Sequence, residues 1–196
     1  LTGITKFSQL SIFSELNNIE NISMDEPYAA ICGISEDEIR SQMKEDVDRL
    51  AKNLEVTPEE ALMKLKENYD GYHFTYPSPD IYNPFSLLTA MEKGKIGSYW
   101  FGSGTPTYLI KMLDKFGVKP SEIGRKQLKS SAFDAPTETM TDAVPLLYQS
   151  GYITIKDYNK MLDLYTLDIP NKEVRLGLME SLLPHYVDNK TPEATT

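Results

Sequence analysis

The segment from Asn68 to Leu113 constrains this chain most, because large aromatic rings alternate in it with tight-turn residues. It contains the chain's only tryptophan, Trp100, and six of the twelve tyrosines. One buried aromatic side chain removes about 150–250 Å² from water, so a cluster of this size is expected to lie inside the protein. We therefore expect this segment to form a joint on which helices pack.

Two helices are predicted before the joint. Residues Ser35–Glu38 and Thr57–Glu60 both have the pattern of a capping box, and Pro58 suits the first position of a helix. Apolar residues follow each box at spacings of three and four, which predicts one amphipathic helix from the first box to Leu54 and another ending at Gly71. The predicted buried residues are Ile39, Met43, Val47, Leu50, Leu54, Leu62, Leu65 and Tyr69.

Two further helices are predicted within the joint and at its end. Asn83-Pro84 opens the first, which ends at Gly94, and Thr105-Pro106 opens the second, which ends at Gly117. The residues expected to face inward are Phe85, Leu88 and Met91 in the first helix and Leu109, Met112, Leu113 and Phe116 in the second.

The last third of the chain predicts a helix, a β-hairpin and a closing helix. Asp142 is placed to cap a short helix that tolerates Pro145 in its first turn and ends at Gly151. Residues 152–156 and 162–169 are predicted strands, with turn residues at 157–160 between them. The closing helix follows Pro170-Asn171 with an apolar stripe at Val174, Leu178, Leu182 and Tyr186. This order suggests a winged-helix-like unit.

Composition excludes several classes of function. The single cysteine, Cys32, rules out an internal disulfide, and two distant histidines make a zinc site improbable. A net charge of −9 disfavours a surface that follows nucleic-acid phosphates, although it leaves a local basic patch open. No apolar run approaches the length of a membrane span, and no signal peptide is apparent, so we expect a cytoplasmic protein with no membrane contact.

The residues that could carry chemistry are few. No GxxxxGK[ST] loop is present, so the chain alone is not expected to hydrolyse a nucleotide. His73 could be a general base oriented by Asp70, but a packing role is favoured because no nucleophile is near in sequence. Residues 102–106 resemble an anion-binding turn, although a simple helix start is the commoner meaning of the pattern. No catalytic or metal-ligating residue is predicted.

Eight short segments together give a resemblance over nearly the whole chain. They read LTGITKFS, FSELNN, NYDGYHF, YNPFSLL, YWF, GTPT, LLYQSGY and IPNKEVR, in this order. In these segments the chain is similar to the bacterial AAA-ATPase-like family. In that family a P-loop ATPase domain precedes such motifs and a PD-(D/E)XK nuclease-like domain often follows them. The resemblance implies that both neighbours are missing here and that the chain is a piece of a longer protein.

The resemblance also implies a domain organisation and a site. Residues 1–34 would be a remnant of the ATPase core, residues 35–135 a helical lid, residues 136–188 a winged-helix-like domain and residues 189–196 a linker. The expected fold is mainly α with a small β-hairpin. The residues expected near the nucleotide are Thr2, Thr5 and Lys6 at the sensor position and Gly104, Thr105 and Pro106 in a G-x-P motif. ATP and Mg²⁺ are expected as cofactors of the full-length protein, and no cofactor is expected for this chain alone.

Two functions from different classes follow. The first is a sensor, lid and winged-helix portion that couples the nucleotide state of the full-length protein to a nuclease-like or effector domain. The second is a non-enzymatic interaction module whose acidic winged-helix surface binds a protein partner or another copy of itself. A DNA-binding variant ranks third, because Lys156 and Lys160 are the only basic residues of the hairpin.

Overall fold

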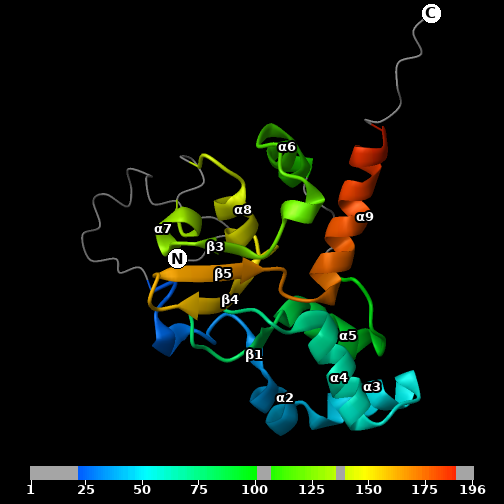
Figure 1. Ribbon diagram of the computed structural model, residues 1–196. Helices are drawn as coiled ribbons and strands as arrows, with labels where there is room; N and C mark the ends of the chain where they lie inside the picture. Colours follow the sequence, from blue (N-terminus) through cyan, green and yellow to red (C-terminus); the bar gives the residue numbers. More distant parts are fainter. Residues whose placement is uncertain (1–21, 101–106, 136–139, 189–196) are drawn as a thin grey trace, which may run out of the picture.

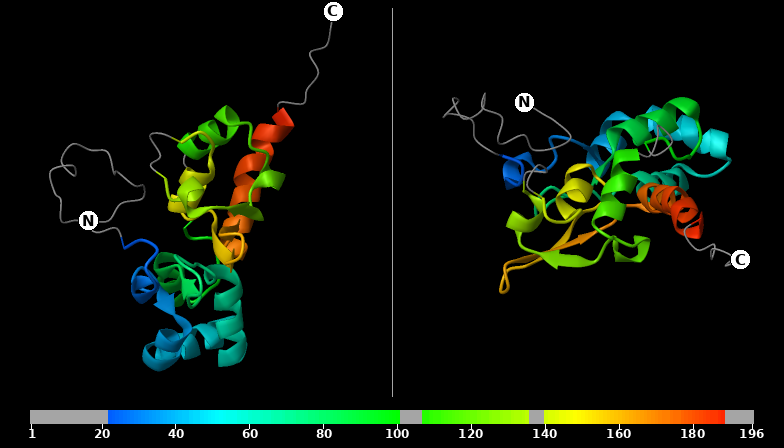
Figure 2. Two further views of the ribbon diagram at one scale, coloured as in Figure 1. Left: turned by 60° about the vertical axis from the view of Figure 1, so that its left-hand side comes forward. Right: turned by 90° about the horizontal axis from the view of Figure 1, so that it is seen from above.

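Residues 22–100, 107–135 and 140–188 are described by a computed structural model (Figure 1). Helices form most of its regular structure and are joined by two small antiparallel sheets, so the expected mainly α fold with a small β component is confirmed. Figure 2 shows two parts: the helices of residues 36–93 gather on one side, and a sheet with the helices of residues 107–188 gathers on the other.

The first part is a group of short helices beside a two-stranded sheet. Strands β1 (Ile34–Ser35) and β2 (Ile81–Tyr82) pair antiparallel. The helical elements are η1 (Glu26–Tyr28), α2 (Glu36–Gln42), α3 (Lys44–Leu54), α4 (Pro58–Tyr69) and α5 (Pro84–Lys93).

The second part is built on a three-stranded antiparallel sheet. Its strands are β3 (Lys126–Leu128), β4 (Thr154–Asn159) and β5 (Leu164–Asp168), in the spatial order β3-β5-β4. The helical elements are α6 (Thr107–Lys115), η3 (Pro120–Glu122), α7 (Ser130–Phe133), α8 (Val144–Gln149) and α9 (Lys172–Asp188). In Figure 1, α6, α7 and α8 lie above the sheet and α9 rises beside it.

Both predicted capping boxes are present, but the first helix is not continuous. The Ser35 hydroxyl accepts from the Glu38 backbone N–H, the Thr57 hydroxyl accepts from that of Glu60, and each glutamate accepts from its own cap. The prediction of one helix from residue 36 to Leu54 is wrong, because Met43 leaves the helical conformation at φ −119° and ψ 24°. The break lets α2 pack on β1 while α3 packs on α4 and α5.

Helix α5 has the predicted ends but a different buried face. Asn83 accepts from the backbone N–H groups of Phe85 and Ser86, and Gly94 ends the helix at φ +63°. Phe85 and Leu88, which were expected to face inward, are 55% and 47% exposed. The buried residues are instead Ser86, Leu87, Ala90 and Met91. Leu87, Ala90 and Met91 stand at spacings i, i+3 and i+4, so the buried face is the one that carries them.

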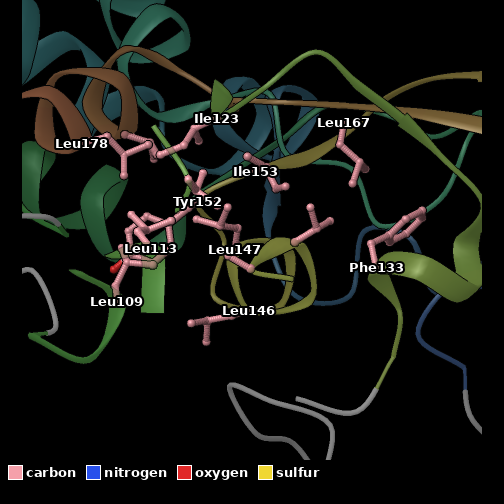
Figure 3. Packing of buried hydrophobic residues seen from close by; sticks show 14 of the residues in the cluster. Leu109, Leu113, Ile123, Phe133, Leu146, Leu147, Tyr152, Ile153, Leu167 and Leu178 are labelled. Atoms are coloured by element: carbon pink, nitrogen blue, oxygen red, sulfur yellow. The ribbon is translucent and has the colours of Figure 1, made fainter. Parts of the chain in front are cut away.

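Two apolar cores hold the described residues together. The helical core joins α2 to α5 through Ile39, Val47, Leu50, Ala51, Ala61, Leu62, Leu65, Tyr69, Tyr82, Leu87, Ala90 and Met91. The sheet core surrounds α8; Figure 3 shows part of it, and its members include Leu109, Leu113, Ile123, Phe133, Leu146, Leu147, Tyr152, Ile153, Leu167 and Leu178. Helix α6 therefore shares its core with α8 and α9.

The hairpin is confirmed, with its turn later than expected. Strand β4 continues through Asn159, so the residues 157–160 that were predicted as the turn lie mostly in the strand. The Asn159 side chain then accepts from the backbone N–H groups of Met161 and Leu162 and shapes the turn. A register shift between Ile155 and Asp157 gives the strand its extra residue.

The closing helix α9 begins as predicted. The Asn171 side chain accepts from the Val174 backbone N–H at 3.1 Å, and Val174, Leu178 and Leu182 are buried. The expected strand end within residues 1–21 and the expected linker at 189–196 lie outside the described residues.

Candidate functional site

The two cores meet where the chain crosses between them, and we call this region the junction. It comprises residues 70–73, residues 99–100 and residues 169–173, with the strand β4 and the start of α5 beside them. The junction contains parts of four of the segments on which the family resemblance depends, although these segments are far apart in the sequence.

The first crossing is held by backbone carbonyl groups. The Asn171 side chain donates to the Asp70 carbonyl at 3.0 Å, and the Lys156 ammonium donates to the carbonyls of Gly71 and Pro170. Gly71 has a φ of +93°, which a residue with a Cβ atom rarely adopts. A Cβ atom there would lie 2.6 Å from the Pro170 oxygen, so the close approach of these segments requires glycine.

His73, at the end of this crossing, is hydrogen-bonded to strand β4. The Thr154 hydroxyl accepts from the His73 backbone N–H at 2.9 Å and donates to the His73 carbonyl at 2.7 Å. The His73 Nε2 atom lies 2.9 Å from an oxygen of Asp80, so the carboxylate beside the ring is Asp80 and not Asp70, the partner in the less favoured general-base alternative. Burial lowers the pKa of His73, although the Asp80 carboxylate opposes that shift.

The second crossing is held by Glu173, which sequence reasoning missed. One oxygen of this buried carboxylate accepts from the backbone N–H groups of Tyr99 and Trp100, the second bond measuring 2.9 Å. The other oxygen accepts from the Ser86 hydroxyl at 2.7 Å. The carboxylate therefore joins α9, α5 and the peptide that passes from one core to the other.

Aromatic rings fill the space between the crossings. The Trp100 and Tyr152 rings lie 5.2 Å apart at an interplanar angle of 52°. Gly151 has a φ of +79°, and a Cβ atom there would lie 3.6 Å from the Tyr72 ring and 3.9 Å from that of Trp100. Tyr72 itself is buried, and its hydroxyl bonds to the side chains of Asn83 and Asn171. Desolvation raises the pKa of this hydroxyl, which keeps it protonated.

Two buried ionisable groups lie at the edge of the junction. Burial raises the pKa of Asp70, and the Gly71 N–H and the Lys66 ammonium, 3.6 Å away, oppose that shift. Burial lowers the pKa of Lys156, while the carboxylates of Asp80, Asp70 and Asp168 raise it. Among the described residues, Asp70 Oδ1, His73 Nδ1 and the Tyr82 hydroxyl are buried without a hydrogen-bond partner.

Many of the hydrogen bonds of the junction hold backbone groups in position. A side-chain bond from Ser86 to Glu173 adds to them. Within the described ranges, no group of three or more histidine, cysteine and carboxylate side chains is arranged to hold a metal ion. His73 has a carboxylate beside it but a ring nitrogen that is buried, so its geometry is that of a hydrogen-bonding residue in a packed interface.

The six residues predicted to lie near a nucleotide are outside the described residues. Thr2, Thr5 and Lys6 precede residue 22, and Gly104, Thr105 and Pro106 lie between Trp100 and α6. The structure therefore does not bring these two groups together or separate them. It does describe both flanks of the G-x-P segment, Trp100 on one side and α6 on the other, and both belong to the sheet core.

Glu173 could not be singled out from sequence. It occupies the first turn of a helix after Pro170-Asn171, where an acidic residue is usually a solvated group that favours the helix dipole. Its burial depends on Ser86 and on the 99–100 peptide, which lie more than seventy positions away along the chain. The one available signal was that its segment, IPNKEVR, belongs to the resemblance.

Comparison with known proteins gives one informative match. An uncharacterized protein in the vnfD 5′ region of Azotobacter chroococcum mcd 1 is 33% identical over 192 residues. The aligned region covers 95% of this chain and 34% of that protein, so the chain spans about a third of the length of the relative it matches. No protein-family model matches the chain, and no solved structure matches it.

Membrane insertion finds no support in the helices that the structure describes. None of them, within residues 22–100, 107–135 and 140–188, combines the length and the apolar character that crossing a bilayer requires.

Proposed function

We propose that this chain is the coupling portion of a larger, nucleotide-driven cytoplasmic protein. A helical lid, α2 to α5, and a winged-helix-like unit, α6 to α9, would pass the nucleotide state of a preceding P-loop domain to a downstream nuclease-like or effector domain. The observation that carries the proposal is the junction. Four of the segments that resemble the AAA-ATPase-like family lie there together, at the two crossings that join the cores.

The strand order of the second part supports the winged-helix element of the proposal. Its elements follow the order α6, β3, α7, α8, β4, β5, and the sheet has the order β3-β5-β4, so the first strand pairs with the last. A helix, a strand, two helices and a hairpin in this arrangement are typical of a winged helix. We accordingly propose that the unit begins at α6 rather than near residue 136.

The two contacts proposed for the nucleotide come from the resemblance. Gly104, Thr105 and Pro106 would line the base and phosphates from the lid, and Thr2, Thr5 or Lys6 would sense the γ-phosphate. ATP and Mg²⁺ would be gripped by the P-loop of the preceding domain, so this chain would contribute to binding without hydrolysing ATP alone. The G-x-P segment starts at Gly104, four positions after Trp100, whose backbone N–H bonds to Glu173. A nucleotide bound there would therefore act next to the junction.

Nucleotide binding to the full-length protein tests this function. Isothermal titration with ATP and Mg²⁺ should give binding that falls at least tenfold on Pro106→Ala and on Thr2→Ala. Thr89→Ala is a matched control, because Thr89 is partly exposed on α5 and its hydroxyl donates to the Phe85 carbonyl of the same helix. Equal affinity in the wild type and both site variants, or no binding at all, would refute the proposal.

A second candidate function is a non-enzymatic protein-interaction module, and the hairpin tip favours it. Met161 is 92% exposed and Leu162 is 58% exposed at the end of the β4–β5 hairpin. Two exposed apolar residues on a protruding turn suit contact with a protein better than contact with phosphate. Sedimentation velocity over a hundredfold range of concentration tests self-association through the tip. The sedimentation coefficient should rise with concentration for the wild type and stay constant for Met161→Asp.

DNA recognition receives less support from the same unit. In a winged helix, α8 would be the reading helix, but its sequence VPLLYQ has no basic residue and its first four residues are buried. A helix that reads the major groove must expose side chains to base edges. A nucleic-acid partner therefore stays the third choice, in line with the net charge of −9.

A further inference from the structure

The Glu173 carboxylate is buried among neutral donors. Its residue is 3% exposed, and its partners are two backbone N–H groups and the Ser86 hydroxyl. Among the described residues it forms no ion pair. A buried carboxylate without a cation depends on its hydrogen bonds, and removal of those bonds leaves a charge that must reach water. The buried carboxylate is therefore stable while all its hydrogen bonds are present, and losing some of them destabilises the folded state.

The donors of Glu173 belong to different parts of the molecule. Tyr99 packs against the helical core and Trp100 packs against the sheet core, so the bonded peptide is the point at which the chain passes between them. Ser86 comes from α5 in the helical core, and Glu173 itself comes from α9 in the second part. One side chain thus joins three segments: α5, the start of α9 and the peptide of residues 99–100.

The other crossing does not depend on Glu173. Residues 70–73 are held by Asn171, Lys156 and Thr154 through separate hydrogen bonds. Loss of the Glu173 contacts would therefore leave the first crossing intact and weaken the second. The second would still have the ring contact between Trp100 and Tyr152 and the hydrogen bonds between Tyr69 and Gly97. The first crossing would then act as a hinge, and the Glu173 contacts at the second crossing would hold that hinge in one position.

We propose that Glu173 is a latch: its carboxylate holds the two cores in one relative orientation, and its release lets them turn about residues 70–73 without unfolding either core. This proposal concerns the chain by itself and does not depend on nucleotide binding. If the proposed ATP function were wrong, the latch could still be present, and the experiment below does not use ATP.

A distance measurement between the two parts tests the latch. The single cysteine, Cys32, is exposed beside β1, and Met161 is exposed at the hairpin tip, so spin labels on Cys32 and on Met161→Cys report the separation of the parts. Pulsed electron paramagnetic resonance should give one narrow distance distribution for this labelled chain. Glu173→Ala should widen the distance distribution at least twofold. Circular dichroism should show that this variant has the same helix content as the chain with Glu173.

Two variants control for effects other than the latch. Glu180→Ala removes an exposed carboxylate from the same helix and should leave the distribution unchanged. Ser86→Ala keeps both backbone bonds to Tyr99 and Trp100, so it should widen the distribution by less than half as much as Glu173→Ala does. A distribution for Glu173→Ala that equals that of Glu180→Ala would overturn the proposal.

Amide hydrogen exchange in a second variant tests the same contact even if Glu173→Ala does not fold. Glu173→Gln keeps the size of the side chain but offers a weaker, uncharged acceptor. The Tyr99 and Trp100 amides should exchange at least threefold faster in Glu173→Gln, whereas the Leu147 amide in the sheet core, which bonds to the Ala143 carbonyl, should not change. Unchanged exchange at Tyr99 and Trp100 would also overturn the proposal.

Discussion

The Glu173 carboxylate accepts a hydrogen bond of 2.7 Å from the Ser86 hydroxyl, across 87 positions of sequence. This contact gives a hydrogen-bond partner to a serine that α5 buries beside Leu87, while Phe85 is exposed. It also ties α5 to the start of α9. The junction of the two cores is thus organised by polar contacts as much as by apolar packing.

Substitution of Gly71 should destabilise the protein strongly. Gly71→Ala places a Cβ atom 2.6 Å from the Pro170 oxygen and 2.8 Å from the Lys156 ammonium, at a φ of +93°. Left-handed strain and the forced separation of two segments should together cost about 2–3 kcal/mol of the free energy of unfolding. Urea denaturation followed by circular dichroism measures it.

Gly117→Ala is the matched control for that measurement. Gly117 has a φ of +63°, but a Cβ atom there meets nothing within 4 Å. Only the backbone strain applies, which is about 1 kcal/mol. If both variants lost the same stability, the close approach at Gly71 would contribute nothing and the packing of the first crossing would be misassigned.

Loss of the hydroxyl group should lower the free energy of unfolding at one buried tyrosine, Tyr69, and have little effect at another, Tyr82. The Tyr69 hydroxyl donates to the Gly97 carbonyl at 2.8 Å and accepts from its N–H at 3.0 Å. Tyr69→Phe should therefore cost about 1–2 kcal/mol. The Tyr82 hydroxyl is buried and has no partner among the described residues, so Tyr82→Phe should change stability by less than about 0.5 kcal/mol or increase it. Thermal and urea unfolding of the two variants compare them directly, and a larger loss for Tyr82→Phe would show that its hydroxyl has a partner.

Stability should decrease as the solution is acidified through the range of histidine titration, and His73 should be a cause. Burial holds the pKa of His73 below its ordinary value, so the unfolded chain binds the proton more readily than the folded one. The stabilising contribution is complete above the unfolded pKa of about 6.5 and is lost as the pH falls below it. Unfolding free energy measured from about pH 7.5 to about pH 5.5 should fall more for the wild type than for His73→Gln.

Asp70 contributes to the same pH profile with the opposite sign. Burial raises its pKa, so protonation in acid favours the folded state. This effect is present in the wild type and in His73→Gln, and the difference between the two profiles removes it. Parallel profiles would mean that the His73 ring is as well solvated when folded as when unfolded.

The helix ends were predictable because they depend on neighbours in sequence. Ser35, Thr57 and Asn83 cap the helices that they were expected to cap, and Gly94 ends its helix in the left-handed conformation. Capping needs only a side-chain oxygen within three residues of a free N–H group, so local sequence determines it. The existence of the hairpin was predictable from the alternating residues 152–156, but the position of its turn was not, because β4 continues through Asn159.

The short strands and the junction were not predictable from local pattern. Strands β1 and β2 have two residues each, which is too short for an alternating pattern to appear. The burial of Ser86 and Glu173 is decided by the packing of segments 87 positions apart. The pairing of His73 with Asp80 spans seven positions but depends on a loop whose path has no regular pattern. Residues of this kind look like ordinary caps or surface groups until the chain is folded, and only the shared occurrence of their segments in a resemblance drew attention to them.

Amide hydrogen exchange of the full-length protein with and without ATP and Mg²⁺ tests the central claim most directly. If the chain couples nucleotide state through the junction, ATP should change the exchange rates of the Tyr99 and Trp100 amides, which Glu173 binds, at least fivefold. Pro106→Ala should abolish that change. Saturating ATP that binds but leaves these two amides at their unliganded rates would contradict the account.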